Sequence, residues 1–277
     1  MASAPPDWNE ANRRHWNERV PIHVASAFYD VEGFVAGHRQ VEPFEIDELG
    51  PLGELRLAHL QCHFGLDTLD LVRLHPGLIG VGLDFSDQAV AAARSLARRV
   101  GLDDRCSFVH GDVMAAASLL DPSSFDVVYT GKGALGWLND LAGWAASALA
   151  LLKPGGFLYL SEFHPVGHAL SFSEPTVGDD YFRTEPWVDE TAGSYADESA
   201  VTEHNLAVCW NHPISSVLTA LLGAGFEIRF FHEFDYTLFR LNEWLVDDGH
   251  GHWRWPSESA RLPLMYSLKA FRPAGPG

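Results

Sequence analysis

The residue types best suited to chemistry gather in one segment, residues 57–86, which reads LAHLQCHFGLDTLDLVRLHPGLIGVGLDFS. Its apolar pattern predicts a strand, a turn, a helix and a second buried strand, at 55–61, 66–74 and 79–84. Gly65 lets the chain turn before the helix because it has no Cβ atom. Asp84 ends the second strand, where a carboxylate suits a ribose diol, and the helix N-terminus suits an anionic group. The segment therefore predicts a site for a nucleotide-type cofactor.

The elements that must position these residues alternate along the chain. We predict strands and helices at 55–61, 66–74, 79–84, 87–99, 106–110, 125–130, 141–152, 157–163, 213–223, 226–231 and 262–271. Strands separated by helices are typical of a parallel sheet with right-handed crossovers. We expect Lys153–Gly156 to form a turn before the fifth strand, and the last strand to pair antiparallel with the sixth.

Three segments fall outside this alternation. Residues 7–38 are rich in aromatic and charged side chains and are predicted to form one or two helices. Residues 164–211 and 235–260 are irregular and dense in aromatic residues. Loops of that length in a compact domain are usually functional, so we expect both to fold over the same sheet edge and to line a pocket.

Four sequence segments together resemble class I S-adenosylmethionine-dependent methyltransferases: LAHLQCHFG, GVGLDFS, VHGDV, and FDVVYT followed by LLKPGGFLYL. The resemblance covers about residues 55–160 and the terminal hairpin. It implies an α/β fold with a Rossmann-like, doubly wound, seven-stranded sheet that is mostly parallel and has an antiparallel last strand. It also implies an N-terminal helical lid in residues 1–50 and a methyltransferase domain in 51–277, with the insertions at 164–211 and 235–260 forming the acceptor pocket.

The first of these motifs departs from the family pattern. His59 stands where the family has an acid, and Gln61 and His63 stand where it has glycines, while Gly65 is kept. We expect the side chains at 61 and 63 to narrow the space over the cofactor's methionine moiety and to donate hydrogen bonds to its carboxylate. The HLQCHFG variant resembles one subgroup of the family. The alternative is a domain that kept the fold and lost the cofactor.

The resemblance assigns a role to each cofactor residue. Asp84 would hold the ribose, Phe85 would flank the adenine, and Asp112 with the Val113 N–H would contact the adenine edge. Asp112 also suits a helix N-cap. The predicted cofactor-binding residues are Tyr29, Gln61, Cys62, His63, Gly65, Asp84, Phe85, Asp112, Val113, Thr130 and Gly131. Trp16, in the leader, suits a sulfonium cation, although we favour a role in core packing.

Catalytic candidates lie at the end of the fifth strand. His164 is the leading general base because an unperturbed histidine titrates near neutral pH, and Glu162 is the second candidate. Tyr195, Trp210 and His212 are the predicted substrate-binding residues. His164 and His168 are four residues apart, but Pro165 argues against a helix that presents both. We predict no metal; the alternative is a loop site formed by Asp247, Asp248, His250 and His252.

The favoured function is transfer of a methyl group from S-adenosylmethionine, by in-line displacement, to a small and largely apolar metabolite. One alternative is a non-catalytic binding protein with the same fold. A second is a nicotinamide-dependent oxidoreductase, because Asp84 follows the turn at about the spacing of a ribose-binding acid.

Composition limits the partners. The net charge of −18 and the scattered 19 lysines and arginines argue against nucleic acid or an anionic membrane surface. Three widely spaced cysteines suggest no disulfide framework, and no run approaches the roughly 18 apolar residues of a membrane span. The N-terminal residues lack the apolar core of a secretory signal. We expect a cytoplasmic protein whose exposed aromatic residues make a homodimer possible.

Overall fold

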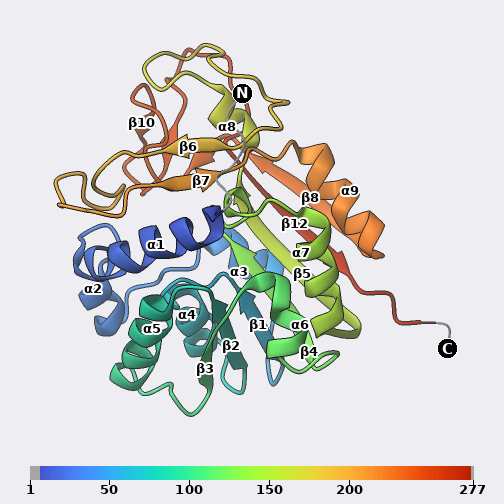
Figure 1. Cartoon of the computed structure of the whole chain (residues 1–277). Helices are drawn as coiled ribbons and strands as arrows, with labels where there is room; N and C mark the ends of the chain where they lie inside the picture. Colours follow the sequence, from blue (N-terminus) through green and yellow to red (C-terminus); the bar gives the residue numbers. More distant parts are fainter. Residues whose placement is uncertain (1–6, 276–277) are drawn as a thin grey trace.

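A seven-stranded sheet forms the centre of the computed structural model, which describes residues 7–275 (Figure 1). The strand order is β3-β2-β1-β4-β5-β12-β8. The strands are β1 Arg56–Leu60, β2 Ile79–Asp84, β3 Cys106–His110, β4 Phe125–Gly131, β5 Leu152–Phe163, β8 Glu227–Phe234 and β12 Met265–Phe271. Neighbours pair in parallel except β12, which runs antiparallel to both β5 and β8. The predicted Rossmann-like sheet with an antiparallel last strand is confirmed.

Helices cover both faces of this sheet. They are α4 Leu66–Leu74 and α5 Asp87–Arg99 on one face, and α6 Ala116–Leu119, α7 Leu141–Leu151 and α9 Ile214–Ala224 on the other. Successive strand residues point to opposite faces, so one strand serves both cores. In β1, Leu57 packs into the core under α4 and α5, while Ala58 and Leu60 pack into the core under α7 and α9.

The N-terminal segment forms α1 Trp8–Ala25 and α2 Val31–Ala36, which agrees with the predicted one or two helices. A third helix, α3 Pro43–Leu49, was not predicted. Pro43 is its first residue, where the missing N–H is not needed, and the Glu42 N–H donates to the Glu45 side chain. In Figure 1, α1 lies directly below the strands β6 Trp187–Asp189 and β7 Ala207–Cys209.

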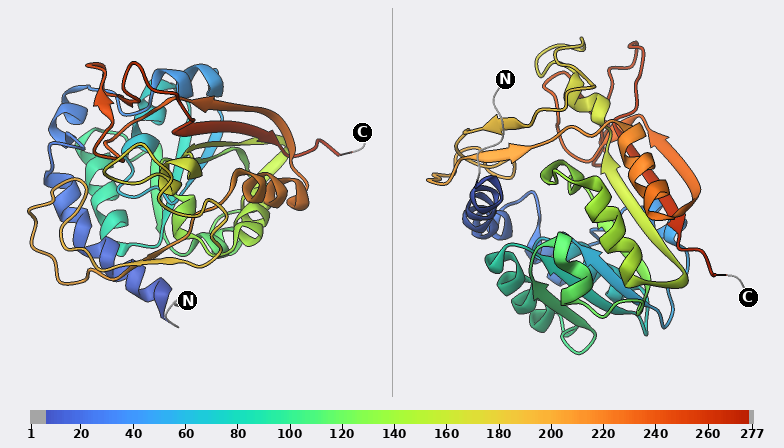
Figure 2. Two further views of the ribbon diagram at one scale, coloured as in Figure 1. Left: turned by 90° about the horizontal axis from the view of Figure 1, so that it is seen from above. Right: turned by 45° about the vertical axis from the view of Figure 1, so that its right-hand side comes forward.

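The two irregular segments contain short elements and pack on each other. Residues 164–211 include α8 Pro165–Ala169 and the β6–β7 hairpin, and residues 235–260 include β9 Tyr236–Thr237, β10 Val246–Asp247 and β11 Trp253–Arg254. The carbonyl of Ser171 accepts hydrogen bonds from the Asn242 and Trp244 side chains, at 3.2 and 2.9 Å. Both segments therefore cover the same end of the sheet, as expected, and Figure 2 shows them from above.

Three local predictions were wrong. The residues from Lys153 to Gly156 are not a turn before the fifth strand: β5 already begins at Leu152 and its register with β4 is irregular there. Pro165 does not prevent a helix but begins α8, because the first helical residue needs no N–H partner. The last strand begins at Met265, not at 262. Among the helices of residues 7–275, none is long and apolar enough to span a membrane.

Candidate cofactor and acceptor site

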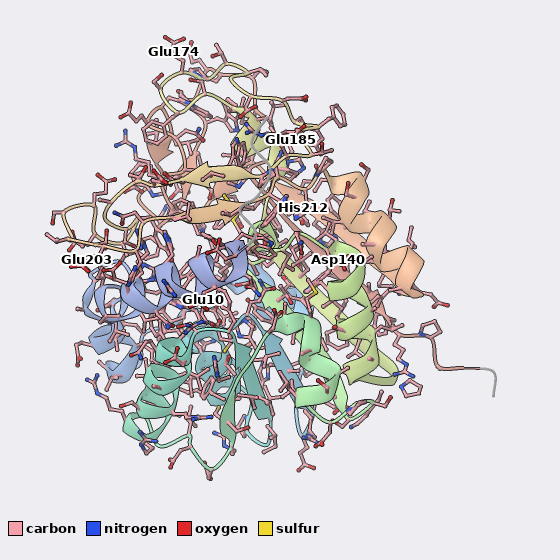
Figure 3. The ribbon with its side chains drawn as sticks, in the orientation of Figure 1. Glu10, Asp140, Glu174, Glu185, Glu203 and His212 are labelled. Atoms are coloured by element: carbon pink, nitrogen blue, oxygen red, sulfur yellow. The ribbon has the colours of Figure 1, made fainter. Side chains whose placement is uncertain are left out.

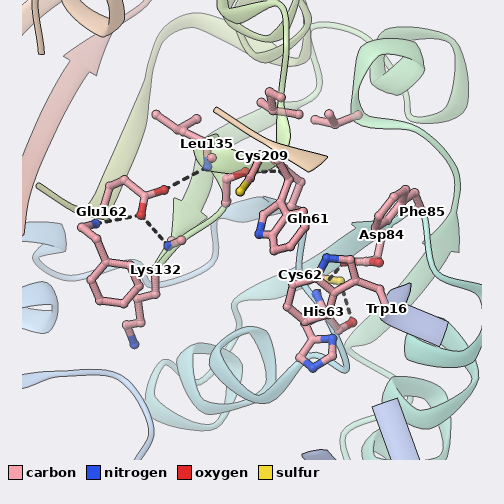
Figure 4. Close-up of a pocket in the computed structure, with 18 of the residues that line it drawn as sticks. Trp16, Gln61, Cys62, His63, Asp84, Phe85, Lys132, Leu135, Glu162 and Cys209 are labelled. Atoms are coloured by element: carbon pink, nitrogen blue, oxygen red, sulfur yellow. Dashed lines mark hydrogen bonds between the residues drawn. The ribbon is translucent and has the colours of Figure 1, made fainter. Parts of the chain in front are cut away.

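A cavity of about 770 Å³ opens at the carboxyl ends of the central strands, between the sheet below and α1 with the two irregular segments above. In an open parallel sheet this edge is where ligands bind, because the loops after neighbouring strands diverge there. The loops after β1, β2, β3, β4 and β5 each contribute lining residues (Figure 4). One cavity therefore brings together most of the predicted site residues.

The loop after β1 keeps an unusual backbone although it has lost two glycines. Gln61 and His63 have φ values of 57° and 50°, and Gly65 has 81°. Such left-handed conformations cost a residue other than glycine about 1–3 kcal/mol. At Gly65 a Cβ atom would lie 2.5 Å from a ring carbon of Phe108, so only glycine fits. The loop thus holds the shape that a glycine-rich motif favours, at some cost in strain.

The side chains of Gln61 and His63 do not donate to the cavity as expected. The Gln61 amide nitrogen donates to the Ala134 carbonyl at 2.8 Å, and His63 Nε2 lies 2.9 Å from His23 Nδ1. The other atom of the Gln61 amide, Oε1, is buried without a hydrogen-bond partner in the described chain. A buried acceptor in a cavity wall suits an N–H donor on a ligand, such as an ammonium group.

Asp84 is held from two sides. Its Oδ2 accepts the His63 N–H at 2.7 Å and its Oδ1 accepts the Ser86 N–H at 2.9 Å. Burial raises the pKa of this carboxyl to about 6, and the two backbone N–H groups oppose that shift. Each carboxylate oxygen has a second lone pair, and the side chain lines the cavity. The arrangement leaves acceptor capacity for a diol.

At the next loop, Phe85, Asp112 and Val113 line the same end of the cavity. Asp112 Oδ1 accepts the Met114 N–H at 2.9 Å, so Asp112 caps the short helix that follows β3, η1 Val113–Ala115. Asp112 Oδ2 also accepts from the Asn9 side chain of α1 at 3.0 Å. Asp112 therefore acts as the N-cap that the sequence suggested, and its side chain still lines the cavity.

Glu162 organises the loop after β4. Its carboxylate accepts backbone N–H groups of Gly133, of Leu135 at 2.9 Å and of Phe163 at 2.7 Å (Figure 4). Burial raises the pKa of Glu162, and these N–H groups lower it. Gly131 and Lys132, in the same loop, line the cavity. Because its oxygens are engaged by the backbone, Glu162 suits a positioning role better than that of a base.

Two predicted residues do not line the cavity. His164 is buried as the N-cap of α8, with Nδ1 accepting the Val166 N–H and Nε2 3.1 Å from Glu233. Thr130 is buried in β4. His168 does line the cavity, from α8, with its ring centroid 5.7 Å from that of Trp187. Desolvation of the imidazole lowers the pKa of His168, so the ring is neutral at pH 7. The sequence signal for His168 was its spacing of four residues from His164. We discounted it because Pro165 argued against a helix that presents both side chains.

The upper part of the cavity is aromatic. Tyr195, Trp210 and His212 line it, as do Tyr29 and Cys209, while Cys62 lines the lower part from the loop after β1. Trp187, Phe239 and Trp253 also line the cavity, from the two irregular segments that were expected to form the pocket. The aromatic lining residues outside those segments that the sequence did not assign to the pocket are Trp8, Phe28, Phe64, Trp137, Phe163 and Tyr266. Trp16 lines the cavity too, and its ring also packs edge-on against those of His23, His63 and Trp137, as the favoured packing role expects.

Polar contacts hold some of these walls. The Tyr195 and Tyr29 hydroxyls hydrogen-bond each other. His212 Nε2 lies 2.8 Å from the Leu138 carbonyl, and Figure 3 shows His212 near the start of α7, close to Asp140. Among residues 7–275, no group of three or more histidine, cysteine, aspartate or glutamate side chains is arranged to hold a metal ion.

Comparison with known proteins matches this region to a family. A family model described as a methyltransferase domain matches residues 58–158, which run from β1 into β5. Residues 58–158 are a methyltransferase domain, and solved structures of S-adenosylmethionine-dependent methyltransferases share the fold of the chain. The matched residues include Gln61, Asp84 and Asp112, so the methyltransferase domain itself supplies the lower half of the cavity.

Three similar proteins place the methyltransferase domain among its relatives. A sterol 24-C-methyltransferase of Clavispora lusitaniae is 29% identical over 138 residues, which are 50% of this chain and 36% of that protein. A methyltransferase structure from Mesorhizobium loti is 23% identical with a TM-score of 0.59, covering 86% of this chain and 100% of that one. A geranyl diphosphate C-methyltransferase structure from Streptomyces coelicolor A3(2) is 14% identical with a TM-score of 0.60, covering 98% and 100%.

Proposed function

We propose that this chain transfers a methyl group from S-adenosylmethionine to a small, largely apolar acceptor. The observation that carries the proposal is the single cavity of about 770 Å³, which joins the cofactor loops of the methyltransferase domain to an aromatic upper half. Ligand sites of this size are commonly lined by apolar and aromatic side chains with a few polar groups. The sterol and geranyl diphosphate methyltransferases among the similar proteins support an apolar acceptor.

The cofactor would lie along the strand ends. Asp84 would accept from the ribose hydroxyls, and Phe85 and Val113 would flank the adenine beside Asp112. The unpartnered Gln61 Oε1 would accept from the ammonium group of the methionine moiety. Gly131 would lie near the sulfonium, and the aromatic face of Trp16 would favour that cation.

S-adenosylmethionine supplies a methyl group that leaves its sulfonium sulfur for an acceptor atom in line with the breaking bond. The residues of this chain position the reactants and exclude water, and no covalent nucleophile is required. Glu162 holds the loop from Gly131 to Leu135 in place through its backbone contacts. An acceptor that must lose a proton would find a neutral imidazole at His168, which we favour over His164 as base because it lines the cavity.

Titration calorimetry with S-adenosylmethionine and its demethylated product, S-adenosylhomocysteine, tests the cofactor site. We expect the wild-type chain to bind both, and Asp84→Ala to weaken binding about 100-fold, since two charge-assisted hydrogen bonds are lost. Asp104→Ala, at an exposed position, should bind like the wild type.

Two outcomes would contradict the proposal. The first is a wild-type chain that binds neither compound. The second is binding of NADH in place of both, which would favour the oxidoreductase. Transfer of a radiolabelled methyl group to a panel of apolar metabolites then separates an enzyme from a non-catalytic binding protein.

We also propose that the partners are small molecules rather than nucleic acid, since the net charge is −18. The three cysteines are free thiols in the structure, which suits a reducing compartment such as the cytoplasm.

A further inference from the structure

α1 crosses the loops that surround the proposed cofactor position. Near its start, the Asn9 amide donates to Asp112 after β3 at 3.0 Å. At its middle, Asn17 accepts from the Ser86 hydroxyl after β2 at 2.6 Å and donates to Asp87 at 2.8 Å. These contacts join one helix to two separate loops that carry cofactor residues. A cofactor seated on those loops would therefore lie beneath α1, and α1 would have to move for it to enter or leave.

The end of α1 reaches the third such loop through His63. The backbone N–H of His63 donates to Asp84 Oδ2 at 2.7 Å, and its Nε2 lies 2.9 Å from Nδ1 of His23 in α1. The same residue thus contacts the proposed ribose acid through its backbone and the covering helix through its ring. A glycine at 63 would adopt the φ of 50° without strain but would lack the ring.

The contact continues into the segment between β6 and β7. Nε2 of His23 lies 2.6 Å from the Ser194 hydroxyl, and His23 is fully buried. The next residue, Tyr195, hydrogen-bonds Tyr29 through its hydroxyl, and the Tyr29 ring stacks on His23 with centroids 5.1 Å apart. Ser194, His23 and His63 therefore form one chain of hydrogen bonds across three separate segments.

Both rings in this chain are neutral. Burial lowers the pKa of His23 to about 3 and that of His63 well below its usual value. A neutral imidazole has one N–H and one lone pair, so one hydrogen between each pair of atoms satisfies both bonds. These hydrogen bonds need no charged group, so their burial carries no cost of desolvating a charge.

We propose that His63 is a positioning residue that latches a lid, consisting of α1 and residues 193–197, to the cofactor loop. The inference rests on the proposed function. While the Ser194–His23–His63 chain is intact, the lid stays closed over the cofactor and excludes water during transfer. Release of the demethylated product requires the His23–His63 hydrogen bond to break, and the Ser194–His23 bond, which lies within the lid, orients the His23 ring for that contact. The imidazole at 63, in place of glycine, thereby couples cofactor retention to lid closure.

Stopped-flow tryptophan fluorescence of S-adenosylhomocysteine release tests this proposal, with Trp16 as a nearby reporter, its ring centroid 5.2 Å from that of His63. We expect His63→Gly and His23→Ala each to speed release about tenfold, the equivalent of one hydrogen bond. The double variant should release no faster than either single variant, because both break one chain. Hydrogen exchange in α1 should rise in all three. His38→Ala, at an exposed position, is the matched control.

The outcomes separate the two proposals. Wild-type affinity with unchanged release from His63→Gly, or additive effects in the double variant, would overturn the latch and leave the proposed function standing. A wild-type chain that binds no S-adenosylhomocysteine would overturn both. If His23→Ala fails to fold, His63→Gly and Ser194→Ala carry the test, since glycine suits the backbone at 63 and Ser194 contributes a single hydroxyl to the chain.

Discussion

Gln61 and His63 show how the proposed cofactor loop keeps its backbone with side chains where the family pattern has two glycines. Each residue keeps a left-handed backbone that costs it about 1–3 kcal/mol. Each side chain makes a contact that glycine lacks, Gln61 with the Ala134 carbonyl and His63 with His23. A net hydrogen bond contributes about 0.5–1.5 kcal/mol, which offsets part of the strain. The loop is therefore held by its neighbours as well as by its own backbone preference.

The proposed contact of Asp84 with the ribose predicts that cofactor binding depends on pH. Its pKa of about 6 means that the carboxyl takes up a proton below pH 6, and a protonated oxygen no longer accepts from a ribose hydroxyl with a full charge. The affinity for S-adenosylhomocysteine should be constant above about pH 7 and fall about tenfold per pH unit below pH 6.

Calorimetry from pH 5 to pH 8 measures this dependence, with Asp84→Asn as the matched variant. Asp84→Asn should bind weakly and without the decline. Burial also raises the pKa of Asp67, another lining residue, to about 6. A decline that persists in Asp84→Asn would assign the effect to Asp67 and contradict the prediction.

At the scale of elements, α1 is attached to β7 by a side chain that behaves like a peptide group. The Asn12 amide donates to the Val208 carbonyl at 2.7 Å and accepts the Val208 N–H at 2.8 Å. Arg19, also buried in α1, donates to the His204 carbonyl at 3.0 Å. The free edge of β7 is thus covered by α1, which satisfies backbone groups that would otherwise be unpaired.

Asn12→Ala should therefore loosen the contact between α1 and the β6–β7 hairpin. Two buried backbone groups of Val208 lose their partner, which we expect to cost about 1–3 kcal/mol of unfolding free energy. Urea unfolding measures that cost, and hydrogen exchange should locate the loss at the Val208 amide. Arg14→Ala, which removes only an exposed contact to Glu10, serves as the control. Equal stability of the two variants would refute this account of the α1 attachment.

At the scale of the whole molecule, a buried ion pair joins the N-terminal segment to the sheet. Lys132, after β4, lies 3.0 Å from Glu45 of α3 and 3.4 Å from Asp67 of α4. The Tyr129 hydroxyl donates to the same Glu45 carboxylate at 2.7 Å. Glu45 is fully buried, so Lys132 and Tyr129 replace the water that would otherwise solvate its carboxylate.

Lys132→Met should destabilise the whole chain by about 3–5 kcal/mol, because it leaves a buried carboxylate without its cation. Adding Glu45→Gln should restore part of that loss. The comparison variant is Lys153→Met: Lys153 pairs with Asp126 at 2.8 Å but is half exposed, so at most about 1 kcal/mol is expected. Denaturant unfolding of the three variants measures these losses in unfolding free energy. A similar loss for Lys132→Met and Lys153→Met would contradict the prediction that burial makes the Lys132 pair more important.

The sequence alone determined the central elements of this protein. The predicted helices 66–74 and 87–99 and strands 79–84 and 106–110 match α4, α5, β2 and β3 as observed. Each of these segments buries a regularly spaced set of apolar residues, such as Ala89, Ala93 and Leu96 of α5, so hydrophobic periodicity and a local cap such as Ser86 specify them. The acid at the end of β2 follows directly from that pattern, because the carboxyl ends of parallel strands share one edge.

Only the tertiary structure decided what surrounds those elements. The short strands β6, β7 and β9 to β11, which were not predicted, form by pairing with one another inside the two irregular segments. The choice of His168 over His164 for the cavity depended on the direction in which α8 leaves the sheet. His23, His63 and Ser194 lie up to 171 residues apart in sequence and meet because α1 folds back over the sheet edge. Contacts of that kind depend on packing, since the free energy that forms them comes from burial of the whole fold.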